Sequence, residues 1–174
     1  LRPRRSTRHR ASGPAVAALV SRADAPDLNA LTVDSFRVLP FECLREEDFS
    51  SSADSGLNRH ATPVALGDCD AFLSHSWHDS AADKWKALSS WATSRKDAPS
   101  TLLWLDKACI NQNSIEASLM CLPVFLSGCQ QLLLLVGPSY VTRLWCVMEV
   151  FIFMRMKDNG TTGAAQHASP GAAP

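Results

Sequence analysis

A chain of 174 residues that is 46% hydrophobic and 20% charged is long enough for one globular core and too short for two. Its formal net charge of zero hides an uneven distribution, because residues 1–23 carry six arginines and no acid, which leaves 11 basic against 17 acidic residues in the rest. No uninterrupted apolar run approaches the roughly 18 residues that span a bilayer, and the basic residues after position 23 are scattered, so the sequence argues against a membrane-spanning or nucleic-acid-binding protein.

The first 66 residues predict a tail followed by an arm. Residues 1–30 mix Arg, Ser, Ala and Pro without sustained periodicity, and we expect a disordered basic tail. Its composition also suits an organelle-targeting leader, or contact with nucleic acid or a membrane surface. Because residue 1 is Leu and not Met, we expect the chain to begin inside a longer product. Residues 31–66 hold enough apolar side chains to pack on a core as an ordered arm, with a short helix near Cys43–Asp48 and a loop at 51–56.

Residues 67–157 alternate between strand and helix patterns. Short apolar runs indicate strands, and apolar residues that recur at helical spacing indicate helices. The predicted elements are a strand at 69–75, a helix at 79–94, a strand at 101–106, a loop at 107–113, a helix at 114–129 bent or interrupted at Pro123, a strand at 131–137 and a helix at 142–157. After Asp158 the composition becomes Gly, Ala, Ser, Thr and Pro, so we expect 158–174 to be a disordered C-terminal linker.

This alternation predicts an α/β fold with a parallel sheet in strand order 2-1-3 and helices on its faces. Ligands of such sheets bind beyond the carboxyl ends of the strands, where the strand order reverses. The polar residues that the pattern brings to this edge are Ser74, His75, Ser76 and Trp77 after the first strand and Asp106 and Lys107 after the second. The helix that follows the third strand reaches the same edge.

That last helix carries Glu149 in an otherwise apolar face. Its neighbours at helical spacing are Trp145, Ile152 and Phe153. A carboxylate in such surroundings either reaches water at the edge of the apolar stripe or needs a cleft, partner or ligand that satisfies it. We interpret Glu149 as a candidate functional residue because the other polar segments converge on the same place.

The six cysteines form no CxxC pair, and several lie inside apolar strand or helix patterns. We therefore expect reduced, packed thiols in a cytoplasmic domain. His75 and His78 with Cys69 or Cys109 lack the spacing of zinc ligands, so we predict no metal. Cys146 with His75 would resemble a nucleophile and its base, but apolar neighbours of Cys146 favour a packed thiol.

Three segments together resemble the Toll/interleukin receptor homology (TIR) domain, in its bacterial and plant-like forms. They are CDAFLSHSWHD at 69–79, LWLDKACINQ at 103–112 and SYVTRLWCVMEVFIF at 139–153, and the resemblance covers roughly 67–157. The segment LDKACINQ also resembles the signature of heterokaryon-incompatibility (HET) domains. The resemblance implies a flavodoxin-like three-layer fold, although nothing after Lys157 resembles the last two of the usual five strands. Either residues 31–66 complete a smaller sheet, or the chain is a fragment whose LLLLV strand forms an exposed edge.

In enzymatic TIR domains the equivalent of Glu149 is the catalytic residue of NAD+ hydrolysis, which needs no cofactor because NAD+ is the substrate. The resemblance implies that Phe72 and Trp145 wall the pocket, that Ser74, His75 and Ser76 line its floor beside Trp77, and that Asp106 and Lys107 begin a mobile loop that gates it. It also implies a homo-oligomer built through TIR contacts.

Two departures from the family pattern matter for the substrate. Plant members have Arg and Gly where this chain has Ser76 and Trp77, and often a Ser where it has Arg143. Our hypothesis is that Arg143 supplies the phosphate-binding charge that Ser76 lacks. The alternative function is a noncatalytic TIR or HET-type module that signals by self-association, which the shortened sheet and the missing Arg favour.

Overall fold

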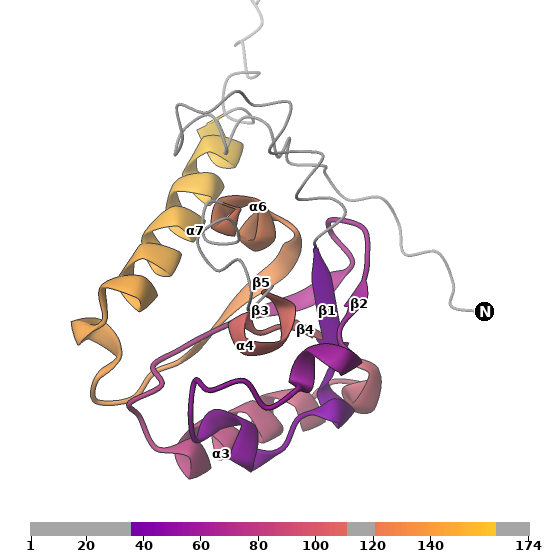
Figure 1. The fold of residues 1–174 in the computed structure, drawn as a ribbon. Helices are drawn as coiled ribbons and strands as arrows, with labels where there is room; N and C mark the ends of the chain where they lie inside the picture. The colour runs from indigo at the N-terminus through magenta and orange to yellow at the C-terminus, as the bar shows by residue number, and fades with distance from the viewer. Residues whose placement is uncertain (1–35, 111–120, 163–174) are drawn as a thin grey trace, which may run out of the picture.

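The computed structural model describes residues 36–110 and 121–162, the last six of these by their backbone alone (Figure 1). The predicted tail at 1–30, the first part of the helix expected at 114–129 and most of the predicted C-terminal linker therefore lie outside the described residues. Within them the chain forms a mixed α/β fold around one five-stranded sheet. No helix in these ranges is long and apolar enough to cross a bilayer.

The sheet has the strand order β2-β1-β4-β3-β5. Its strands are β1 (Arg37–Pro40), β2 (Thr62–Pro63), β3 (Cys69–His75), β4 (Leu102–Trp104) and β5 (Cys129–Leu135). The central strand β3 runs parallel to β4 and β5, whereas β1 is antiparallel to both β4 and β2. The sheet is therefore mixed and not purely parallel as predicted, because the arm at 37–63 adds two strands beside β4.

Strand β5 differs from its prediction in burial. The predicted sheet had helices on its faces, but Leu134 is 40% exposed and the following Val136 is 64% exposed. The reason is its position, since β5 is the outermost strand and pairs only with β3 among the described strands. An uncovered edge strand presents unpaired backbone groups to solvent.

Within the described ranges, four α-helices and five 3-10 helices connect the strands. They are η1 (Phe41–Cys43), η2 (Glu46–Phe49), η3 (Leu57–His60), α3 (Ala81–Thr93), η4 (Ala98–Ser100), α4 (Asp106–Cys109), α6 (Leu122–Ser127), η5 (Tyr140–Thr142) and α7 (Leu144–Thr162). Ser80 caps α3 by accepting a hydrogen bond from the Asp83 amide at 3.2 Å. In Figure 1 the strands lie between α3 and the neighbouring pair α6 and α7.

Two local predictions were wrong, and a third falls partly outside the described residues. The helix expected near Cys43–Asp48 is replaced by the two 3-10 helices η1 and η2. The start of the loop expected at 107–113 is helix α4, whose first turn holds Asp106, where a negative charge is favourable. Pro123 lies in the first turn of α6, where its missing amide hydrogen costs nothing, and most of the helix predicted before it lies outside the described residues.

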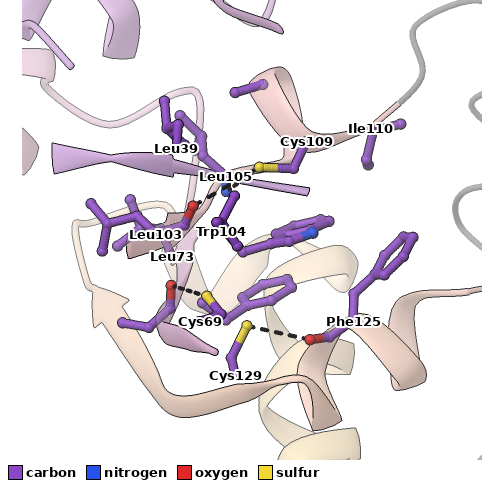
Figure 2. Close-up of a cluster of buried hydrophobic side chains, with 14 of the residues drawn as sticks. Leu39, Cys69, Leu73, Leu103, Trp104, Leu105, Cys109, Ile110, Phe125 and Cys129 are labelled. Atoms are coloured by element: carbon purple, nitrogen blue, oxygen red, sulfur yellow. Dashed lines mark hydrogen bonds between the residues drawn. The ribbon is translucent and has the colours of Figure 1, made fainter. Parts of the chain in front are cut away.

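The core lies between the sheet and its helices and is built around aromatic rings (Figure 2). Phe72 stacks on Trp104 with ring centroids 4.2 Å apart, and Trp104 packs on Phe125 at 5.5 Å. Phe36 of the arm also stacks on Phe125. Three free thiols, Cys69, Cys109 and Cys129, are buried in the same cluster. The arm is thus part of the core and not a separate layer over it.

Candidate functional site

A cavity of about 180 Å³ opens at the carboxyl ends of β3 and β4, next to the start of α7. It is lined by Leu73, His75, Ser76, Trp77, Asp106, Arg143, Trp145, Cys146 and Glu149. These residues come from three separate parts of the chain, which the parallel strands bring together at one edge. Seven of the ten predicted site residues line it, and Phe72, Ser74 and Lys107 do not.

Glu149 lies in the wall of this cavity with only 3% of its surface exposed. Its Oε2 accepts a hydrogen bond from the Ser74 hydroxyl, and that hydroxyl lies 2.6 Å from the Tyr140 hydroxyl. Burial raises the pKa of the Glu149 carboxyl to about 8. Hydrogen bonds from Ser74 and Trp145 act against this rise, and the nearby Asp106 carboxylate adds to it. With a pKa of about 8, the carboxyl is mostly neutral at pH 7.

Helix α7 directs Glu149 inward because Cys146, Glu149 and Ile152 share its buried face. At the helix start, the Cys146 thiol donates a hydrogen bond to the backbone carbonyl of His75 at 3.3 Å. This contact joins the first turn of α7 to the end of β3. The helix and the strand that carry the cavity are thus held together beside the carboxyl group.

Trp77 is the centre of the charged side of the site. Its indole Nε1 donates to Asp106 Oδ2 at 3.3 Å, while the ammonium groups of Lys84 and Lys107 lie 5.5 and 5.6 Å from its ring centroid. Lys84 is buried and donates to the Ser76 carbonyl at 2.9 Å, and burial lowers its pKa. These contacts hold the residues after β3 against the start of α4.

His75 is buried between the rings of Phe49 and Trp77, at centroid distances of 5.5 and 4.3 Å. Neither of its ring nitrogens has a hydrogen-bond partner within the described parts of the chain. Burial lowers the pKa of His75, while the Asp106 carboxylate acts in the opposite direction. Burial also raises the pKa of the Cys146 thiol to about 11. A nucleophilic Cys146 with His75 as its base is not supported, because the thiol bonds to the His75 carbonyl and not to its imidazole.

The three predicted site residues outside the lining have other contacts. Phe72 belongs to the core, where it stacks on Trp104, and it lies outside the cavity lining. Ser74 lies behind the cavity and positions Glu149. Lys107 does not begin an open gating loop, because it is buried in α4 and its ammonium donates to the carbonyls of Asp48 and Ser51 at 3.2 and 3.0 Å.

Several residues that support the site were not predicted from the sequence. Tyr140, the one tyrosine of the chain, supports Ser74, and Lys84 holds Ser76. Asp79 accepts a hydrogen bond from the Ser139 amide at 2.9 Å, and a side chain on Gly137 would collide with the Asp79 carboxylate. The available signals were the position of Tyr140 beside the helix of Glu149 and the glycine after the third strand.

Among residues 36–110 and 121–162, no group of three His, Cys, Asp or Glu side chains is arranged to hold a metal ion. The arrangement instead offers a buried carboxyl group, aromatic rings and one exposed guanidinium, Arg143, at a small cavity. Such a set can stabilise a positive charge and orient a ring and an anion. No protein-family model, curated protein or solved structure matches this chain.

Proposed function

We propose that this chain is a TIR-like signalling domain that hydrolyses NAD+ to nicotinamide and ADP-ribose products, with Glu149 as its catalytic residue. The observation that carries the proposal is the placement of Glu149. Its carboxyl is buried in a cavity wall, bonded to Ser74 and beside Trp145. A buried ionisable group with a strongly raised pKa in a cleft is typical of a functional site.

The chemistry of NAD+ hydrolysis explains why one carboxylate is enough for catalysis. When the bond between ribose C1′ and the pyridinium nitrogen breaks, its electron pair passes to that nitrogen and leaves neutral nicotinamide. Positive charge then develops on the ribose, and a fixed carboxylate in a site poor in water stabilises it. A water oxygen then bonds to C1′ and releases a proton. We expect the positively charged substrate to lower the pKa of Glu149 on binding, which would ionise the carboxyl where its charge is needed.

The cavity size agrees with binding one end of a dinucleotide. A volume of about 180 Å³ is below the roughly 300 to 1,000 Å³ of pockets that enclose whole ligands. We infer that nicotinamide and its ribose enter beside Trp145 and Glu149. The diphosphate would then lie outside, near the exposed Arg143.

The function is tested by measuring nicotinamide release from NAD+ by the full chain at high protein concentration, with NADH as the control substrate. The ring nitrogen of NADH carries no positive charge, so reduced nicotinamide is a poor leaving group. We expect release from NAD+ and none from NADH. Absence of release from NAD+ by a folded chain, checked by circular dichroism, would contradict the proposal.

Arg143→Ala is expected to raise the KM for NAD+ about tenfold or more with little change in kcat, since a charge-assisted contact to phosphate contributes about 1.5 to 3 kcal/mol. The matched control is Arg155→Ala, which removes an exposed arginine of α7 that does not line the cavity. Steady-state kinetics of nicotinamide release measure both variants. Equal KM values for wild type and Arg143→Ala would remove Arg143 from substrate binding.

The fold that we propose with this function is the flavodoxin-like three-layer arrangement with the order 2-1-3 at its centre. The neighbours β4-β3-β5, all parallel, support it. Buried free thiols such as those of Cys69, Cys109 and Cys129 fit a cytoplasmic location, which we propose as well.

The second candidate function is a noncatalytic TIR or HET-type module that acts by self-association. The exposed apolar face of α7 favours it, because large apolar patches mark interaction surfaces. Release of nicotinamide that depends on Glu149 would separate the two candidates.

A further inference from the structure

Helix α7 is apolar on two sides, and the described part of the chain covers only one of them. Its buried side carries Cys146, Glu149 and Ile152. Its other side carries Leu144 at 75% exposure, Val147 at 44%, Phe151 at 63% and Met154 at 59%. Helices that are apolar all round are normally covered all round. We call Leu144, Val147, Phe151 and Met154 the α7 seam.

The spacing of the seam indicates what fits it. Its four residues follow one another at intervals of three, four and three, which is the spacing of the core positions of a coiled coil. Such a seam presents its side chains to one partner helix, whose own seam fills the spaces between them. In Figure 1 α6 lies beside α7, and the described elements that pack on α7 are chiefly α6, η5 and β3. The four seam residues nevertheless stay exposed, so the described part of the chain leaves this place for a partner helix unfilled.

The lack of charged side chains on the seam favours the same seam of a second copy of the chain as its partner. No ionisable side chain lies on the open side between Leu144 and Met154, and Glu149 faces the cavity. Two copies related by a twofold axis can therefore bring the open sides of Leu144–Met154 together without a charged side chain between them. Val141 and Met148, exposed by 72% and 38%, widen the apolar surface beside the seam. Large exposed apolar side chains gathered in this way mark an interaction site.

The segment 163–174, which follows α7, is poor in side chains that could cover this face. Residues 163–174 consist of Gly, Ala, Gln, His, Ser and Pro and include no large apolar side chain. We propose that the α7 seam is the surface through which two copies of this chain associate, by antiparallel packing of α7 on α7. The interface is isologous, so each copy contributes the same four residues.

This pairing also affects the cavity, a consequence that rests on the proposed function. Trp145 and Glu149 lie on the same helix as the seam, one face away. Packing of the outer face fixes the helix from both sides and keeps Glu149 against Ser74. Nicotinamide release per chain is then expected to rise with protein concentration.

The test is sedimentation velocity of the full chain over a wide range of concentrations, without any substrate. We expect a concentration-dependent dimer for wild type, and at least about tenfold weaker association for Phe151→Asp, because the new carboxylate would be buried in the interface. Phe151→Leu keeps an apolar seam and is expected to remain a dimer. Ala87→Asp adds the same charge at an exposed position of α3 and is the matched control. Circular dichroism checks that each variant is folded.

A wild-type chain that stays monomeric at all concentrations would overturn the proposal, as would a dimer that Phe151→Asp leaves intact. If the seam were protected from hydrogen exchange in a monomer, another part of the same chain would cover it. That result would also overturn the proposal. Because sedimentation needs no substrate, loss of the dimer in Phe151→Asp supports the interface even if the wild type releases no nicotinamide. Failure of the interface and failure of the enzyme are therefore seen separately.

Discussion

Glu149→Gln is expected to lower the rate of nicotinamide release by at least about 100-fold, because it removes the buried carboxyl group from the wall of the cavity. Glutamine has nearly the same shape and its amide oxygen can still accept the hydrogen bond from Ser74. The substitution therefore tests the charge and not the packing. Release is measured with saturating NAD+ so that the effect on kcat is separated from any effect on binding.

The control for this variant is Glu47→Gln, which neutralises an exposed acid in η2 far along the chain from the cavity lining. It is expected to keep the wild-type rate. A Glu149→Gln variant that retains the wild-type rate would show that the carboxylate does not act in the reaction, and would move the assignment to the noncatalytic module.

The same substitution is expected to stabilise the fold, by about 3 kcal/mol at pH 7. The pKa of Glu149 is about 8 in the folded protein against 4.5 for the unperturbed group. The folded state thus keeps a proton that the unfolded state releases between these two values. As pH rises through this window, unfolding becomes more favourable for wild type, whereas glutamine does not titrate. The gain from the substitution is small below about pH 4.5, grows with pH, and levels off above about pH 8.

Urea unfolding of both proteins at pH 5, 7 and 8.5 would measure this gain. A difference in stability that stays the same at the three values of pH would contradict the raised pKa. Glu47→Gln again serves as the reference, since it removes an acid from an exposed position. A variant that is more stable and less active is the pattern expected when a site holds an unfavourable buried group for its chemistry.

Local patterns predicted the strands and the main helices well. The range 69–75 was predicted for the first core strand, and β3 spans Cys69–His75. The apolar pattern from 142 predicted α7, which begins at Leu144. These predictions succeeded because each element buries its own side chains in a repeating pattern, which periodicity detects.

The periodicity of the sequence could not predict which distant segments pair with each other. One alternative predicted that residues 31–66 complete a smaller sheet, and β1 and β2 do so, but nothing in residues 37–40 indicated β4 as the partner, because a four-residue strand carries little pattern. The helical turn of α4 was too short to show helical spacing. Tyr140 and Lys84, which position other site residues by hydrogen bonds, were missed for the same reason. Their partners Ser74 and Ser76 lie in another segment.

The alternation of β3 explains the division of its predicted site residues. Leu73 and His75 line the cavity, whereas Phe72 and Ser74 point to the opposite face of the strand. On that face Phe72 meets Trp104, and Ser74 meets Tyr140 and Glu149. Within β3, neighbours such as Ser74 and His75 therefore could not both line the cavity, which the two-residue period of a strand already implied, whereas Ser76 and Trp77 follow the strand and do line it.

The place of β1 in the sheet has a consequence for how the protein is made. Leu39 of β1 pairs with Leu103 of β4, which emerges from the ribosome long after it. During synthesis the buried side chains of the arm, such as Phe36, Leu44 and Phe49, must wait for their partners. At the usual rate of roughly 5 to 20 residues per second this wait lasts several seconds. We therefore expect the nascent arm to be the segment that holding chaperones bind, and folding to complete only when β5 and α7 have followed.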